Sequence, residues 1–325
     1  MLTANGMLTA IGGLIIVDVV IFGGSGLIGQ ALAATVEESG GTAFILSRSR
    51  QLTRYGTTVP YSLETLHQVI GALPIDGPYA IVNLAGESIA GGRWTTQRKQ
   101  AIRDSRVILT EALANAIRNL EVPPSVFVSG SAVGYYGTST TATFTESNLP
   151  GDGFLTDVTC AWEDAAQMAL PATRVVLLRT GVVLAANKGA LAQMALPYRF
   201  FAGGRVGSGL QWVSWIHIAD VSGMILHCIN NEEIYGPVNV TAPNPVQMDE
   251  FGKSIAIVLR RPHFMPVPSG VMRALLGEMS QIMLEGQRVL PEKALDTGYV
   301  FMFPEVRAAL FDLLSPNRHP LSASP

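Results

Sequence analysis

The sequence predicts an α/β fold, a doubly wound parallel sheet followed by a small, mainly helical C-terminal lobe. Short apolar runs alternate with amphipathic stretches, which is the βαβ pattern of a parallel sheet. The runs lack polar–apolar alternation, as expected when helices cover both faces. After residue 245 the pattern changes to helices bounded by prolines. The expected strands are residues 17–22, 43–47, 79–84, 125–129, 174–180 and 237–240, and the expected helices are residues 27–39, 95–119, 156–169 and 218–229.

The composition argues against several classes of protein. The 325 residues are 48% hydrophobic and 14% charged, with a net charge of −3, so a large core is expected. Because there is no basic excess, we expect neither a nucleic-acid partner nor binding to an anionic membrane. The distant Cys160 and Cys228 fit a reducing compartment, and the five histidines lack the spacing of a metal site.

A glycine-rich segment directly follows the first expected strand and opens the first helix. Without Cβ atoms the backbone can approach a pyrophosphate closely, and the helix N-terminus offers N–H groups and a positive dipole end to phosphates. In this strand–loop–helix order the pattern predicts the dinucleotide-binding loop of a Rossmann fold. The expected contacts are Gly23, Gly24, Ser25, Gly26, Leu27, Ile28 and Gly29.

The end of the second expected strand indicates which dinucleotide binds. An acidic residue there would hydrogen-bond the ribose 2′-hydroxyl of NAD. Here no acidic residue occurs between Glu38 and Glu64, whereas Arg48 and Arg50 are present. A guanidinium can pair with a 2′-phosphate, so the sequence favours NADP(H), with Ser47 and Arg48 as the contacts. A solvated pair of surface arginines is the alternative.

Several later motifs carry a family resemblance. They include "VNLAGESIAGGRW" after the third strand, "VSGSAVGYYG" after the fourth, "AWEDAA", "GSGLQWVSWIHIADV" and "GQRVLP". Together they resemble the atypical short-chain dehydrogenase/reductases of the NAD-dependent epimerase/dehydratase type, from about residue 17 to residue 314. The resemblance implies a Rossmann core, a small C-terminal domain and bound NADP(H), but no particular substrate.

The resemblance also implies a domain division and further cofactor contacts. Residues 1–16 would be an N-terminal extension, 17–245 the NADP-binding domain, 246–314 a substrate-side lobe and 315–325 a tail. The further contacts would be Leu84, Ala85 and Gly86 beside the adenosine and pyrophosphate, Arg106 in the following helix, and Val182 near the nicotinamide.

The catalytic Tyr-x-x-x-Lys pair of this superfamily is missing. No tyrosine is followed four residues later by lysine, and Leu155 and Thr159 occupy the corresponding helix positions. Ser131 corresponds to the superfamily's catalytic serine region, and Tyr135 and Tyr136 follow on the same loop. We expect Ser131 to polarise a carbonyl and a tyrosine to donate a proton. The alternative is that all three pack the pocket floor.

Residues after the third strand lie on the side where substrates of the superfamily bind. Glu87, Arg93 and Trp94 are the candidates there: Arg93 could hold an anionic group and Trp94 could stack on a ring, or the segment could be a plain surface loop. His217 is a candidate acid/base group, with a structural role as the alternative.

These observations predict an NADP(H)-dependent oxidoreductase acting on a small or sugar-like carbonyl or alcohol. One alternative is a nucleotide-sugar-type epimerase that retains its NADP⁺. Another is a non-catalytic NADP(H)-binding protein acting through partners, for example in cell or plastid division. We also expect a cytoplasmic location, with a plastid as the alternative, and the resemblance suggests a homodimer.

Overall fold

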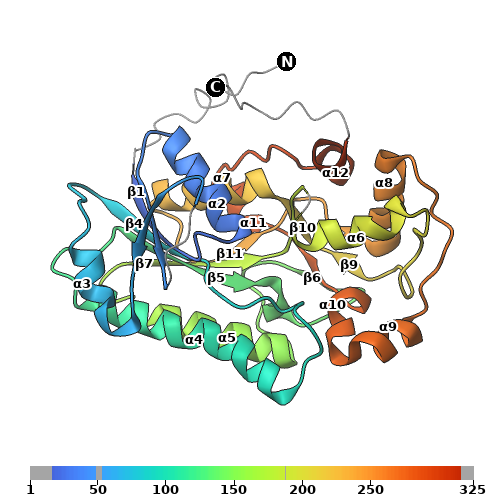
Figure 1. Ribbon diagram of the computed structural model, residues 1–325, viewed down its shortest axis with the longest axis horizontal. Coiled ribbons are helices and arrows are strands. Elements are labelled where there is room, and N and C mark those ends of the chain that lie inside the picture. The colour runs from blue at the N-terminus through green and yellow to red at the C-terminus, as the bar shows by residue number, and fades with distance from the viewer. Residues whose placement is uncertain (1–16, 49–52, 187, 316–325) are drawn as a thin grey trace.

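The computed structural model describes residues 17–48, 53–186 and 188–315. The expected N-terminal extension at 1–16, the tail from residue 316 and Arg50 lie outside the described residues. Within these ranges the chain forms a Rossmann-type core with helices on both faces of a sheet (Figure 1).

The central sheet of the described residues has seven strands, all parallel, in the order β11-β7-β5-β4-β1-β2-β3. The doubly wound sheet is therefore confirmed. Strand β3 was not predicted, because its sequence "TTVP" is short, polar and ends in proline; such a strand is tolerated at the edge of a sheet. The strands are β1 (Asp18–Phe22), β2 (Ala43–Ser47), β3 (Thr57–Pro60), β4 (Tyr79–Asn83), β5 (Val126–Ala132), β7 (Arg174–Thr180) and β11 (Gly236–Val240).

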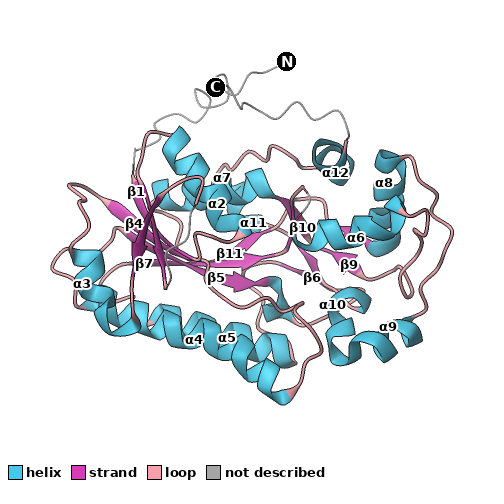
Figure 2. Ribbon diagram, in the orientation of Figure 1, coloured by secondary structure: helices cyan, strands magenta, loops and turns pink. Residues whose placement is uncertain are grey.

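Helices cover the sheet on both faces, as Figure 2 shows. Alternate residues of β1 point to opposite faces: Val19 and Ile21 pack in one core cluster, and Val20 and Phe22 in the other, all without exposed surface. Burying each such side chain contributes about 1.5–3 kcal/mol. The first face carries α2 (Leu27–Glu38) and α7 (Ile218–Asn230), and the second α3 (Leu66–Gly71), α4 (Thr96–Arg118) and α5 (Phe154–Gln167).

A second core lies beside the sheet, around Trp215, Phe251 and Leu310. It includes residues from 184 to 215, so this lobe draws on chain that the expected boundary at residue 245 would assign to the first domain. Its elements are β8 (Val182–Leu184) paired with β10 (Trp215–His217), β9 (Trp212–Val213) paired with β12 (Val246–Gln247), α6 (Gly189–Arg199), α8 (Met248–Leu259) and α12 (Val306–Leu314).

The C-terminal segment also packs back against the main sheet. Strand β13 (Arg288–Val289) pairs with β6 (Thr143–Phe144) in a separate two-stranded sheet, and Ala294 of α11 (Glu292–Asp296) is buried in the core with residues of α7 and β11. Tyr299 Oη donates a hydrogen bond to the Asp220 carbonyl at 3.0 Å. Helices α9 (Ser269–Leu276) and α10 (Gln281–Leu284) lie between α8 and this returning segment.

The described residues contain no helix that is long and apolar enough to cross a membrane. The His, Cys, Asp and Glu side chains in the same part of the chain form no group of three or more that could hold a metal ion. Cys160 and Cys228 are not joined to each other or to another cysteine in this structure.

Candidate functional site

The order of the sheet reverses between β1 and β4, and open parallel sheets bind ligands at such a point, beyond the carboxyl ends of the strands. Leu84, just past β4, donates its N–H to the carbonyl of Phe22 at 2.9 Å, where β1 ends. The glycine loop and the segment from Leu84 to Gly86 therefore lie side by side at this edge.

Two glycines of the loop are required by its geometry. Gly23 has φ +76°, and a Cβ there would lie 2.8 Å from the backbone of Leu84 and Ala85. At Gly29 a Cβ would lie 2.5 Å from the Gly23 oxygen and from the Gly24 Cα. Any side chain at either position would push the loop away from β4 or α2 away from β1.

The glycine loop leads into α2, and no side chain caps the N–H groups of the first turn of this helix. Gly26 is the N-cap residue and supplies no side-chain cap, and the first turn carries no acidic residue. Ser25 and Gly26 are exposed. The N–H groups at this end are therefore available to an anion, together with the positive end of the helix dipole. The loop fits the pyrophosphate of a dinucleotide.

The end of β2 brings a cation to the same edge. Burial raises the pKa of Tyr61, and the positive charge of Arg48 opposes that rise, which places the guanidinium near the phenol. The Tyr61 ring packs edge-to-face on Phe22, 5.2 Å between centroids, directly before the glycine loop. Ser47 ends β2, and the exposed Arg48 follows it.

Arg106 reaches from α4 to the segment after β4. Its Nη1 donates to the Ile102 carbonyl at 2.9 Å and its Nη2 to the Glu87 carbonyl at 3.0 Å. A Cβ on Gly86 would lie 3.1 Å from the guanidinium carbon. Burial lowers the pKa of Arg106 to about 10, so the group stays charged at neutral pH beside the expected pyrophosphate position.

A buried cluster of polar side chains lies at the carboxyl ends of β5 and β7. Ser131 Oγ lies 2.6 Å from Glu163 Oε1, and Glu163 accepts two hydrogen bonds of 2.9 Å from Arg179. The side chains of Arg179 and Glu163 are 4% and 5% exposed. Burial lowers the pKa of Arg179, but the hydrogen bonds and charge of Glu163 outweigh it and the net shift is upward.

This geometry orients the serine. The carboxylate of Glu163 can only accept hydrogen bonds, so the Ser131 hydroxyl donates its hydrogen bond to Glu163. The lone pairs of the Ser131 oxygen are then left to accept a hydrogen bond from another group. In that state Ser131 can accept a hydrogen bond from a substrate hydroxyl. The expected polarisation of a carbonyl would first require the Ser131–Glu163 bond to break, so the arrangement favours the alcohol form of a substrate.

The two candidate tyrosines have different surroundings. Tyr136 is 2% exposed; its hydroxyl donates to Asn239 Oδ1 at 2.7 Å and accepts from Arg179 Nη1 at 3.0 Å. Burial raises its pKa to about 12, so its proton is committed to the cluster. The Tyr135 ring faces the Arg179 guanidinium at 3.4 Å from its centroid, and Tyr135 is only half-buried. Burial also raises the pKa of Tyr135, against the charge of Arg179, so its phenol is protonated as well. Within the described residues no hydrogen bond ties the Tyr135 hydroxyl to Asn239 as one does that of Tyr136, so Tyr135 is the better placed of the two to donate a proton.

The substrate-side candidates make contacts within the protein. The indole of Trp94 is buried, donates to the Ile89 carbonyl at 2.8 Å and packs edge-to-face on Phe154. Arg93 donates to carbonyls near the end of α9, and Glu87 pairs with Arg98. The structure thus places Trp94 in a hydrophobic cluster and not on an open face for ring stacking.

His217 also takes a structural position. Its Nδ1 accepts from the Ala219 N–H at 3.1 Å and caps α7, and its Nε2 lies 3.2 Å from Asp312. The ring lies 3.9 Å from that of Phe303 and is buried. Both ring nitrogens of His217 have hydrogen-bond partners within the protein, which favours the structural role over the acid/base role. Val182 begins β8 directly after β7 and is half-buried.

Sequence reasoning missed the most connected pair of the cluster, Glu163 and Arg179. A signal was present in the sequence. Arg179 directly follows the apolar run "VVLL" within a predicted buried strand, and a buried arginine requires a partner of opposite charge. Glu163 follows Thr159 by one helical turn, on the helix where the missing lysine was sought. The Thr159 hydroxyl itself bonds carbonyls of its own helix.

The segment that contains the glycine loop and the sheet is similar to a known protein family. Residues 19–241 match the NAD dependent epimerase/dehydratase family. The chain belongs to this family. A second match covers residues 267–313 and is described as a domain of unknown function.

Relatives of this epimerase-family chain cover from about three quarters of its length to nearly all of it. The epimerase family protein YfhF of Bacillus subtilis is 41% identical over 308 residues, 93% of this chain and 99% of the relative. The chloroplastic SDR39U1 homolog of Arabidopsis thaliana is 43% identical over 73% of this chain and 68% of the relative. The crystal structure of human epimerase family protein SDR39U1 with NADPH has a TM-score of 0.82 at 35% identity, covering 91% of this chain and 98% of the human one.

Proposed function

We propose that the protein binds NADP(H) at the edge formed by the glycine loop and the end of β2, and that it is an oxidoreductase acting on a small or sugar-like alcohol or carbonyl. One observation carries the proposal: an exposed arginine, Arg48, follows β2 where an NAD-binding chain would place an acid. The human relative crystallised with NADPH supports the same choice.

The residues of this chain would divide the work as follows. The uncapped start of α2 and Arg106 would hold the pyrophosphate, and Ser47 and Arg48 the 2′-phosphate. Bound NADP(H) supplies or accepts a hydride at the nicotinamide. Burial raises the pKa of Tyr135, so its phenol is protonated and would donate its proton to the oxygen of a carbonyl being reduced. Ser131, fixed by Glu163, would accept the hydrogen bond of the hydroxyl that forms. In the oxidation direction the deprotonated Tyr135 would take this proton back.

The same serine geometry supports a second candidate, an epimerase that retains its cofactor. Such an enzyme first oxidises an alcohol and then reduces the product on its other face, so it too needs an acceptor for a substrate hydroxyl. The family name includes epimerases. A cytoplasmic or plastid location is likewise a proposal, and the name of the Arabidopsis relative, which is chloroplastic, supports the plastid.

The cofactor proposal is tested by calorimetry with NADPH and NADH. Removing the Arg48 side chain (Arg48→Ala) should weaken NADPH binding about tenfold or more and leave NADH binding unchanged, because one charge-assisted contact contributes about 1.5–3 kcal/mol. Arg103→Ala, an exposed arginine of α4, is the control with the same change of charge. Equal affinity for the two cofactors in the wild-type protein would refute the proposal.

The reaction is tested with NADP⁺ and a panel of sugar nucleotides and small alcohols. Net formation of NADPH absorbance indicates an oxidoreductase, whereas interconversion of stereoisomers without net absorbance indicates the epimerase. Tyr135→Phe should lower either rate about 10²–10⁴-fold without weakening NADPH binding. If NADPH binds tightly but no panel member turns over, the non-catalytic alternative is favoured instead.

A further inference from the structure

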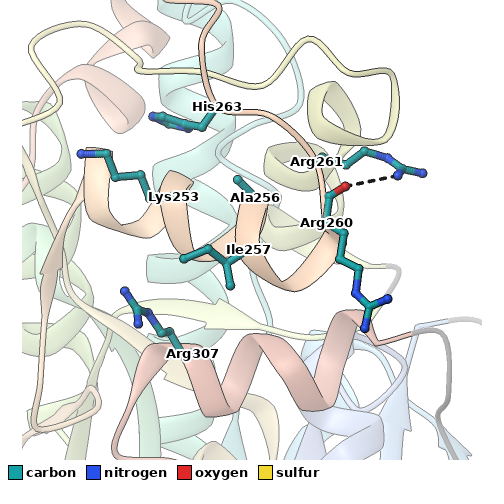
Figure 3. Close-up of a pocket in the computed structure, with 7 residues that line it drawn as sticks. All are labelled: Lys253, Ala256, Ile257, Arg260, Arg261, His263 and Arg307. Atoms are coloured by element: carbon teal, nitrogen blue, oxygen red, sulfur yellow. Dashed lines mark hydrogen bonds between the residues drawn. The ribbon is translucent and has the colours of Figure 1, made fainter.

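A groove remote from the glycine loop in the chain lies over α8 and the start of α12 (Figure 3). Its volume is about 440 Å³, within the range of small-molecule sites of about 300–1,000 Å³. Figure 3 shows Lys253 and Arg307 toward one end and the two consecutive arginines toward the other, with Ile257 between them. The lining residues are Lys253, Ala256, Ile257, Arg260, Arg261, His263 and Arg307.

The groove concentrates positive charge on a protein whose net charge is −3. Four of its seven lining residues are lysine or arginine. Lys253 pairs with Asp249 at 2.7 Å, but no carboxylate of the described residues lies within 4 Å of the guanidinium groups of Arg260, Arg261 or Arg307. Like charges around one hollow repel each other, so the arrangement becomes favourable when an anion occupies it.

Two helices end beside the groove. Arg260, at φ 54°, is the C-cap residue of α8, and Arg261 donates its N–H to the Ala256 carbonyl at 2.9 Å. Phe201, at φ 60°, follows the end of α6, and its ring lies under the guanidinium of Arg261 at 4.4 Å. A left-handed residue is a common way to end a helix, so these turns fix where the two arginines leave α8.

The His263 side of the groove is rigidly built. His263 Nδ1 lies 2.9 Å from Tyr198 Oη and its Nε2 lies 3.0 Å from Asp249 Oδ1. A glycine inside α8 makes room for this, since a Cβ on Gly252 would lie 2.5 Å from Tyr198 Oη and 2.8 Å from the His263 ring. Gly costs an α-helix interior about 1 kcal/mol relative to Ala, so this placement is made at the expense of helix stability.

We propose that this groove is a second anion site, separate from the dinucleotide site, which binds a small molecule carrying two or more phosphate groups. Arginine forks bind phosphate oxygens bidentately, and two pairs of cations at opposite ends suit phosphates linked in a chain. Exposed Ile257 offers an apolar surface between them. Arg307 comes from the 267–313 segment of unknown function, to which this site gives a role.

The experiment titrates the full-length, NADPH-saturated protein with inorganic tripolyphosphate in a calorimeter, at two salt concentrations. We expect one saturable site per chain that weakens with salt. The double variant R260A/R307A should bind about tenfold more weakly, since each of the two exposed charge contacts is worth a factor of about three. R103A/R118A removes the same charge from the exposed face of α4 and should bind like the wild type.

Two further measurements make the result decisive. The NADPH affinity and the thermal midpoint of R260A/R307A should match the wild type, which separates this site from the dinucleotide site and from misfolding. Equal tripolyphosphate binding by all variants, or none at all, would overturn the proposal. So would capture by phosphatidylglycerol vesicles that depends on Arg260 and Arg307 but that tripolyphosphate does not displace, because the groove would then be a membrane surface.

Discussion

The glycine loop and the Ser131–Glu163–Arg179 cluster lie at the same edge of one sheet but are built in opposite ways. The loop works through four glycines within seven consecutive residues, and a Cβ at Gly29 would lie 2.5 Å from backbone atoms. The cluster works through buried side chains from β5, α5 and β7, which meet only in the folded protein. The proposed cofactor loop is therefore encoded locally, whereas the proposed reaction centre depends on long-range assembly.

The largest effect should come from breaking the cluster at its centre. Glu163→Ala leaves the buried Arg179 without a counter-charge, which should cost about 3–5 kcal/mol in the free energy of unfolding, measured with urea at pH 7. Adding Arg179→Met to that variant removes the orphaned charge and should recover much of the loss. A loss below about 1 kcal/mol for Glu163→Ala alone would show that water reaches Arg179.

A single methyl group in the loop should have a smaller effect on stability. Gly29→Ala forces α2 or the loop to move, at a cost of about 1–3 kcal/mol, and should abolish NADPH binding in calorimetry. Gly270→Ala is the matched control: nothing lies within 4 Å of a Cβ there, and the residue is inside α9. That control should be unchanged or stabilised by up to about 1 kcal/mol. Normal NADPH affinity of Gly29→Ala would contradict close backbone approach.

The smallest difference should separate the two neighbouring tyrosines. Tyr136→Phe removes a hydroxyl bonded to both Arg179 and Asn239 and should cost about 1–2 kcal/mol of stability. Tyr135→Phe should leave the urea midpoint nearly unchanged, because its ring contact with Arg179 is retained. Should both variants lose stability equally, Tyr135 would belong to the structural network and the proton would have to pass elsewhere.

Much of the fold could be predicted from the sequence, and the reason is physical. Strands β2 and β7 begin and end at the predicted residues, because runs buried on both faces contrast sharply with the polar turns around them. Helix α6 was missed: it contains Pro197, and its amphipathic pattern is weak. Its position is set by packing against α8 and not by local propensity.

The candidate site could be predicted only in its local part. The glycine loop and the basic end of β2 can be recognised from neighbouring residues, although the cofactor itself stays a prediction. Arg179 at the end of the buried β7 signals that it needs a partner, but the sequence does not identify Glu163 as that partner, because the pair, 16 residues apart, depends on how α5 lies against β7. For Trp94 and His217 the sequence offered a substrate contact and a structural role alike, and choosing between them depends on burial, which residue type alone does not give: both side chains are buried and hydrogen-bonded within the protein.

The return of residues 288–303 to the sheet has a consequence for how the chain is made. Ala294 and Tyr299 cover the surface formed by β11 and α7, and Asn239 of β11 donates to the Leu290 carbonyl at 2.9 Å. Until residues 288–303 have left the ribosome, that flank of the sheet is exposed to water and the Asn239 amide can bond only to water. The sheet therefore cannot reach its final packing during synthesis before these residues have been made.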